Sequence, residues 1–190
     1  MLTGPSENRM MPAKERTKIW DTQIRRFGYY DPENRYSRMS KAGVPTAQIV
    51  ELAKDNGDYL GQVVVDGNIA LNAGLQLIGD LMIAAKTTPT WGAAYIGVGD
   101  SNTAEAATQT GLTAATNKAY QAMVETYPKR VSQQLQFKSS FAAGVASWVW
   151  QEAIVITGNG TGTALNRKVG AWGTKGANDS YDMEIDITLS

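Results

Sequence analysis

The sequence predicts a mainly β fold: a β-sandwich or jelly-roll-like body, one α-helix before it, and an extended N-terminal arm. Three observations lead to this prediction. From residue 91 onward, short alternating or apolar stretches follow one another, separated by glycine-rich turns. One clear helical period precedes them. Residues 1–60 keep neither period for long and contain four of the six prolines. We therefore divide the chain into a docking arm, residues 1–60, and a helix-plus-sandwich body, residues 61–190.

The predicted arm is rich in aromatic side chains. Trp20, Phe27, Tyr29, Tyr30 and Tyr36 all need burial somewhere, so the segment does not read as a plain disordered tail. We expect it to become ordered by lying on the surface of a partner. A short helix is expected within it at residues 46–54, with Thr46 as N-cap and an apolar stripe made of Ile49, Leu52 and Ala53.

The clearer helix is predicted over residues 68–85. Asp66 or Asn68 can cap it, and apolar residues recur at helical spacing: Leu71, Leu75, Ile78 and Met82. Gly74 and Gly79 lower its intrinsic stability and indicate close packing against a sheet or a second helix. Pro89 disfavours helical geometry at the residue before it, so the segment 87–90 ends the helix.

The body is predicted to contain strands at residues 93–98, 131–137, 147–156 and 183–189, with a long threonine-rich loop over 101–116 that has one helical turn at 104–107. In the strand 131–137, Val131, Leu135 and Phe137 share one face. In the strand 147–156 both faces are apolar, which places it at the centre of a sheet or at a subunit contact. Its expected faces are Trp148, Trp150, Ile154 and Ile156 on one side and Val149, Ala153 and Val155 on the other.

The last strand has the cleanest alternation. Met183, Ile185, Ile187 and Leu189 are expected to face the core, while Asp182, Glu184, Asp186 and Thr188 face outward. Three carboxylates at two-residue spacing could hold a calcium ion if a loop supplied further oxygen ligands. We favour the simpler interpretation, a solvated face of a half-buried strand.

The amino-acid composition excludes several kinds of catalytic and binding site. The chain has no cysteine and no histidine, which excludes disulfides, thiolate nucleophiles and imidazole-based acids, bases or ligands. It has no apolar run long enough for a membrane span and no signal-peptide order at residues 1–7. Net charge is zero, yet residues 1–41 hold nine Lys/Arg against five Asp/Glu, and the remainder holds nine against thirteen. A basic arm on an acidic body favours docking of the arm onto an acidic partner.

Five sequence segments carry a resemblance. The run at 95–103, YIGVGDSNT, is followed by the Ala/Thr-rich loop; WVWQE at 148–152 precedes ALNRKV at 164–169 and WGTKG at 172–176; and the alternating strand ends the chain. Over about residues 68–190 this pattern resembles small β-rich virion proteins of tailed bacteriophages. The resemblance implies a non-catalytic protein of the virion, assembled in the cytoplasm of the host bacterium.

The resemblance also implies the partners. These are other virion proteins (capsid, portal or neck, tail) and further copies of the chain, with no membrane. The place in the particle stays open between tail, neck, fibre attachment and capsid decoration. No catalytic residue, metal or cofactor is implied.

A few individual motifs could support other chemistry. Gly158–Gly162 follows an apolar strand as a phosphate loop would, but its spacing is G-x-G-x-G and a hairpin turn is the better prediction. Glu125, Glu152 and Asp100 could serve a hydrolase, although a buried ion pair of Glu152 with Arg167 or Lys168 is the simpler expectation.

The residues expected at assembly interfaces are aromatic and basic. In the arm, the mixture of arginines and rings suits single-stranded nucleic acid or protein, and we favour protein. The full set is Trp20, Arg25, Arg26, Phe27, Tyr29, Tyr30, Tyr36, Trp148 and Trp150.

Two rival functions belong to other classes. One is a carbohydrate- or receptor-binding module whose Trp91, Trp148, Trp150 or Trp172 stacks on sugar rings. The other is a carboxylate-dependent polysaccharide hydrolase that uses Glu152 or Glu125.

Overall fold

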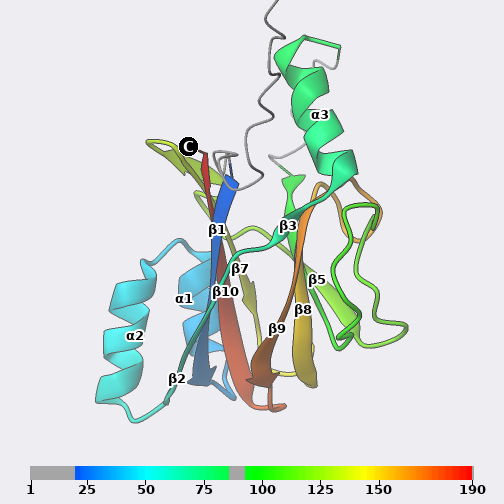
Figure 1. Cartoon of the computed structure of the whole chain (residues 1–190). Helices are drawn as coiled ribbons and strands as arrows, with labels where there is room; N and C mark the ends of the chain where they lie inside the picture. Colours follow the sequence, from blue (N-terminus) through cyan, green and yellow to red (C-terminus); the bar gives the residue numbers. More distant parts are fainter. Residues whose placement is uncertain (1–19, 86–92, 190) are drawn as a thin grey trace, which may run out of the picture.

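The chain forms two antiparallel sheets packed face to face, in a computed structural model that describes residues 20–85 and 93–189 (Figure 1). The first sheet has the order β2 (Tyr59–Asp66), β1 (Trp20–Tyr30), β10 (Asp179–Leu189), β7 (Gln134–Phe141) and β6 (Lys129–Val131). The second has the order β3 (Ile69–Ala70), β9 (Ala164–Thr174), β8 (Val149–Ile156), β4 (Tyr95–Gly99) and β5 (Lys118–Ala122). The predicted β-sandwich class is confirmed.

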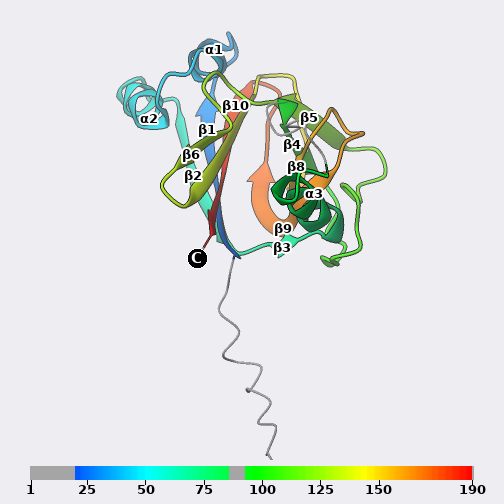
Figure 2. The same ribbon diagram turned by 90° about the horizontal axis from the view of Figure 1, so that it is seen from above.

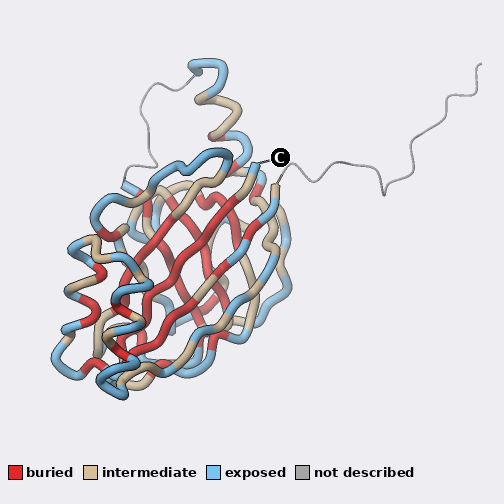
Figure 3. The backbone as a smooth tube through the Cα atoms, turned by 90° about the vertical axis from the view of Figure 1, so that its left-hand side faces the viewer, coloured by how far each residue is buried: buried red, intermediate tan, exposed pale blue. Residues whose placement is uncertain are grey.

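The main core lies between the two sheets. Ile24, Met183 and Ile185 point into it from the first sheet, and Trp150 and Trp172 from the second. The rings of Phe141 and Tyr181 meet Trp150 edge-on at centroid distances of 4.8 and 5.1 Å. Buried residues run along most strands of both sheets (Figure 3).

Two helices, α1 (Arg35–Lys41) and α2 (Thr46–Asp55), cover the outer face of the first sheet (Figures 1 and 2). Phe27 and Tyr29 of β1 pack there against Tyr36 of α1 and against Ile49 and Ala53 of α2. The central strands β1 and β10 are therefore buried on both faces along most of their length. The two helices add a third layer over part of the sandwich. The helix predicted at 46–54 is confirmed, although Pro45 rather than Thr46 is its N-cap.

The described part of the predicted arm belongs to the sandwich. β1 pairs with β10 along its whole length, from Trp20 opposite Leu189 to Tyr30 opposite Asp179, and with β2 on its other side. The prediction of an extended arm is therefore wrong for residues 20–60. Its error has a physical cause: with both faces buried, β1 shows no simple alternation, and its strand partner is at the far end of the chain. Residues 1–19 of the predicted arm lie outside the described residues.

Helix α3 (Asn72–Met82) confirms the predicted helix with tighter limits. Its N-cap is Leu71, not Asp66 or Asn68. Asn68 instead accepts hydrogen bonds from Trp20 Nε1 at 3.0 Å and Thr22 Oγ1 at 2.9 Å. The predicted end of the helix at 87–90 lies outside the described residues.

Two predicted strands differ in detail from the structure. The segment 131–137 spans a hairpin, because β6 ends at Val131 and β7 begins at Gln134. In β8, which is central as predicted, the pairing with β9 shifts between Trp150 and Glu152. This bulge places Trp150 on the same inner face as Ala153 and Val155 rather than with Ile154. The loop over 101–116 is confirmed, without the expected helical turn at 104–107.

Candidate functional site

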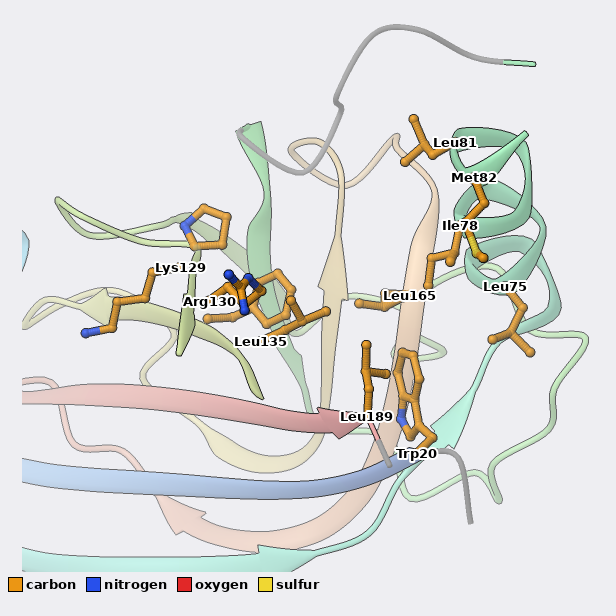
Figure 4. A pocket seen from close by; sticks show the side chains of 12 residues that line it. Trp20, Leu75, Ile78, Leu81, Met82, Lys129, Arg130, Leu135, Leu165 and Leu189 are labelled. Atoms are coloured by element: carbon orange, nitrogen blue, oxygen red, sulfur yellow. The ribbon is translucent and has the colours of Figure 1, made fainter. Parts of the chain in front are cut away.

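An apolar cleft opens at one end of the sandwich, between α3 and the β6–β7 hairpin (Figure 4). Its volume is about 740 Å³, which is within the usual range of ligand-binding pockets. The lining residues are Trp20, Leu75, Ile78, Leu81, Met82, Pro128, Lys129, Arg130, Leu135, Phe137, Leu165 and Leu189. Only two of these twelve side chains carry charge, so we take this cleft as the candidate functional site.

Helix α3 forms one wall of the cleft because of a close approach at its first turn. A Cβ on Gly74 would lie 2.6 Å from Leu165 Cα and 2.8 Å from the Ala164 carbonyl oxygen, so only glycine allows the helix backbone this near β9. Leu71 and Leu77 are buried beside it. The C-terminal half of α3 then extends beyond the sheets (Figures 1 and 3).

The opposite wall and the floor come from the first sheet. Leu135 and Phe137 of β7 face the cleft, and Trp20 and Leu189 lie side by side as a β1–β10 pair at its base. The hydrogen bond from Trp20 Nε1 to Asn68 Oδ1 satisfies the one polar group of the indole and leaves its ring for apolar contact.

Exposed apolar side chains gather at this same end. Of the nine large hydrophobic residues exposed in the described chain, five belong to α3, its C-cap, β6 or the end of β10: Leu75, Met82, Ile83, Val131 and Leu189. Met82 and Ile83 are 81% and 77% exposed. Apolar residues concentrated around a cleft indicate a contact surface, whereas scattered ones would not.

The rim of the cleft is basic on the hairpin side. Lys129 lies over the Tyr127 ring, 4.4 Å from its centroid, and Arg130 donates to the Ser132 carbonyl oxygen at 2.6 Å. No carboxylate is among the lining residues. The largely apolar lining suits contact with another apolar surface.

The acidic face of β10 is buried, so the prediction of a solvated face is wrong. Asp182, Glu184 and Asp186 are each at most 9% exposed, because α1, α2 and neighbouring strands cover them. Arg25 pairs with Asp186 and, at 3.2 Å, with Glu184. Lys138 Nζ lies 3.5 Å from Asp182 and 2.8 Å from Thr46 Oγ1.

Burial governs the protonation of this layer. It raises the pKa of Asp182, an effect that Lys138 opposes, and raises the pKa of Asp186, an effect that Arg25 opposes. A small pocket of about 200 Å³ between the segment that leads into α2 and the segment 124–129 reaches Lys138 and Glu184. In the described part of the chain, no group of three or more acidic side chains is placed to hold a metal ion. The cationic partners of these buried carboxylates are Arg25 and Lys138.

The predicted ion pair of Glu152 is confirmed. Arg167 Nη2 lies 2.7 Å from Glu152 Oε2, and both side chains are fully buried. The pair holds the threonine-rich loop: Glu152 accepts from the backbone N–H groups of Thr113 and Ala114, and Arg167 donates to the Thr103 carbonyl oxygen. Glu125 is exposed, and Asp100 accepts a hydrogen bond from Asn117. Gly158–Gly162 forms the β8–β9 turn, as predicted.

The predicted interface residues differ in burial. Arg26, Phe27, Tyr29, Tyr36 and Trp150 are buried within their own chain, which makes them core residues rather than interface anchors. Arg25 and Trp148 are half-buried, and Tyr30 is exposed. Only Trp20 reaches the cleft. Trp172, named for sugar stacking, is buried, and Trp91 lies outside the described residues.

Of the lining residues, only Trp20 is predicted from the sequence as an interface residue. Leu75 and Met82 belong to the predicted apolar stripe of the helix, and the structure leaves both exposed. The available signal was that Leu77 and Leu81 broaden the stripe into a helix that is apolar on more than one side. Such a helix needs more than one apolar partner.

Comparison with protein-family models, with curated proteins and with solved structures finds no match to this chain. Within residues 20–85 and 93–189, no helix is long and apolar enough to cross a membrane.

Proposed function

We propose that this chain is a non-catalytic structural protein of a tailed-bacteriophage particle, assembled in the host cytoplasm, and that the apolar end of the sandwich is its main contact surface. The observation that carries the proposal is the cleft together with the exposed apolar residues around it. The resemblance of residues 68–190 to small virion proteins supports a place in a phage particle. Tail, neck, fibre attachment and capsid decoration are all compatible places.

The physical argument rests on unburied apolar surface. Each large apolar side chain moved from water into a contact contributes roughly 1.5–3 kcal/mol when it becomes fully buried. Leu75, Met82 and Ile83 are available for such burial without disturbing the core. The packed core between the sheets, and the cluster of α1 and α2 over β1, form the folded body that carries that surface.

Quantitative mass spectrometry of purified particles tests the proposal. The chain should remain in washed particles, at a ratio near one to the major capsid protein for a decoration protein and at a very small ratio for a neck, tail or fibre component. Absence of the chain from washed particles would contradict the proposal.

A variant pair ties particle binding to the cleft. Leu75→Glu should lower the copy number per particle, because it places a carboxylate on the cleft wall. Leu60→Glu is the matched control, since Leu60 is also 47% exposed but lies at the start of β2 beside α2. Equal incorporation of both variants would show that attachment uses another surface.

A further inference from the structure

We infer that Lys138 and Asp182 join in an intramolecular amide bond, a covalent link between the neighbouring strands β7 and β10. The structure brings together the four groups that this reaction needs: an amine, a carboxyl carbon, a base and a hydrogen-bond donor for the developing oxyanion. The inference goes beyond the proposed function and does not depend on it, because it concerns the interior of a single chain.

The two reacting side chains are enclosed by the fold. Lys138 Nζ lies 3.5 Å from Asp182 Oδ2, and the two side chains are 2% and 1% exposed. In the ladder of β7 and β10, Asp182 lies opposite Ser140, two residues from Lys138, so the contact is a diagonal one. Groups held beside each other in a fixed geometry react as if one of them were present at an effective concentration of up to about 10⁵–10⁸ M.

The surroundings of Asp182 favour an electrophilic carboxyl group. Burial raises the pKa of this carboxyl and so favours its protonated form, an effect that Lys138 opposes. No donor in the described residues meets its two oxygens with full hydrogen-bond geometry. A buried carboxylate with a purely structural role is usually held by such donors. Asp182 therefore has the features of a reacting group.

A proton relay leads away from the amine. Lys138 Nζ donates to Thr46 Oγ1 at 2.8 Å, and Thr46 Oγ1 donates in turn to Glu184 Oε1. Glu184 Oε1 also lies 3.9 Å from Lys138 Nζ. Glu184 can therefore accept a proton from the ammonium group, directly or through Thr46, and leave a free amine as the nucleophile.

Two serine hydroxyls lie beside the carboxyl group. Ser40 and Ser140 are buried, and both are near enough to Asp182 to lower its pKa against the larger effect of burial. The Ser40 hydroxyl has no other hydrogen-bond partner among the described residues. It is therefore free to donate to the oxygen that becomes negative when the amine adds to the carboxyl carbon.

The reaction balances within this site. The ammonium of Lys138 gives one proton to Glu184, and the amine lone pair forms a bond to Cγ of the protonated Asp182. The Cγ–Oδ bond then breaks, and the hydroxyl leaves as water with a proton from Glu184. The new amide nitrogen returns a proton to Glu184, so the products are an amide, one water molecule and a protonated Glu184. The pocket of about 200 Å³ that reaches Lys138 and Glu184 provides an exit for the water.

Intact-mass spectrometry of the full-length chain tests the inference. We expect the unchanged chain to be lighter than its sequence mass by one water molecule. Lys138→Arg keeps the positive charge but removes the nucleophile, so this variant should have its full sequence mass. Glu184→Gln keeps both reacting groups and loses the base, so bond formation after refolding should slow by about 100-fold or more.

Tryptic peptides locate the bond. Trypsin should fail to cleave after Lys138, and peptide 131–167 should appear joined to peptide 176–190. Lys168 and Glu105 are the control pair within the same chain. Their nitrogen and oxygen lie 3.7 Å apart, but the side chains are 20% and 22% exposed, so this pair should stay unlinked.

The outcomes separate this inference from the proposed function. A folded chain at its full sequence mass, with trypsin cleaving after Lys138, overturns the inference and leaves the proposed function standing. A water loss that persists in Lys138→Arg also overturns it, because another site must then have reacted. Equal rates of bond formation with and without Glu184→Gln would overturn the role of Glu184 as base.

Circular dichroism and thermal melting establish that each variant is folded. If Lys138→Arg does not fold, the peptide map of the unchanged chain decides alone. If the chain carries the bond but is absent from washed particles, the proposed function fails and the bond stands.

Discussion

At the scale of single residues, the chain depends on charges that it buries and pairs. Glu152 and Arg167 are fully buried and join β8 and β9 to the threonine-rich loop. The exposed pair of Glu51 and Lys54 on α2 offers a contrast, with its nitrogen and oxygen 2.9 Å apart. The nitrogen-to-oxygen distances are similar in the two ion pairs, but one pair is buried and the other is exposed. This difference in burial decides how strongly the loss of one partner lowers the stability of the fold.

Breaking the buried pair should therefore be costly. Glu152→Gln leaves the Arg167 guanidinium buried without its counter-charge and should lower the free energy of unfolding by about 3–5 kcal/mol. Glu51→Gln, the matched control, should change it by less than about 1 kcal/mol. Urea denaturation at neutral pH measures both. Similar small effects from the two variants would contradict the importance assigned to the buried pair.

Lys175 gives the folded chain a distinct pH dependence. Burial lowers its pKa to about 8 from an ordinary 10.5, although Asp179 and Asp31 oppose that change. Its Nζ donates to the Ala142 carbonyl oxygen at 2.9 Å. Below pH 8 the amine is protonated in both states; between pH 8 and 10.5 the unfolded chain binds a proton that the folded chain has released. Stability should accordingly rise with pH across that window.

The size of this effect follows from linkage. Between pH 7 and pH 9.5 Lys175 should add about 2 kcal/mol to the free energy of unfolding. Subtracting the pH profile of Lys175→Met from that of the unchanged chain isolates the contribution from tyrosines that also titrate. A difference that is flat across pH would show that the buried amine keeps its proton.

At the scale of elements, α3 shows how one glycine positions a helix. Gly74 lies against the backbone of Ala164 and Leu165, whereas nothing lies within 4 Å of a Cβ placed on Gly79. From the sequence alone, both glycines are expected to allow close packing. Only the first has that role, because residue 74 faces β9 and residue 79 does not.

Two alanine substitutions should therefore have opposite effects. Gly74→Ala should destabilise the protein by about 1–3 kcal/mol, since backbone atoms of β9 must move to admit the methyl group. Gly79→Ala should be neutral or stabilising by up to about 1 kcal/mol, because alanine is the better helix former. Thermal unfolding of both variants tests this, and a stabilising Gly74→Ala would show that α3 is not held by this contact.

Elements with one strong period were predicted well. α2, α3 and β10 each show a regular apolar spacing, and each is present near its predicted limits. The hairpin of β6 and β7 was missed because its turn, Ser132-Gln133, carries neither glycine nor proline. The faces of β8 were misassigned since a bulge changes the alternation without leaving a mark in the residue pattern.

At the scale of the whole molecule, the two ends of the described chain meet in the middle of the first sheet. β1 lies between β2 and β10, so strands from opposite ends of the sequence share one ladder. Because β1 pairs with strands on both sides, it is part of the folding unit rather than an appendage.

Truncation distinguishes these two views of the N-terminal region. A chain that starts at residue 31 lacks β1 and should fail to fold cooperatively, because β10 and β2 lose their common partner and the core loses Ile24 and Tyr29. A chain that starts at residue 20 keeps every described element and should fold. Far-ultraviolet circular dichroism during thermal melting measures whether each truncated chain folds. Cooperative melting of the shorter chain would restore the idea of a separable arm.

The sequence by itself determined the sandwich class, the existence of the regular helices and strands, and the ion pair of Glu152, because these depend on local spacing and on the cost of burying a charge. It did not determine what covers each face. The acidic side of β10 is buried since α1 and α2 happen to pack over it and Arg25 and Lys138 lie within reach. Within the described residues, α3 is held closely against β9 on one side, and Leu75 and Met82 on its apolar side stay exposed. Alternation reveals that a strand or helix has two faces, but the partners of those faces come from distant segments, and only the tertiary structure brings them together.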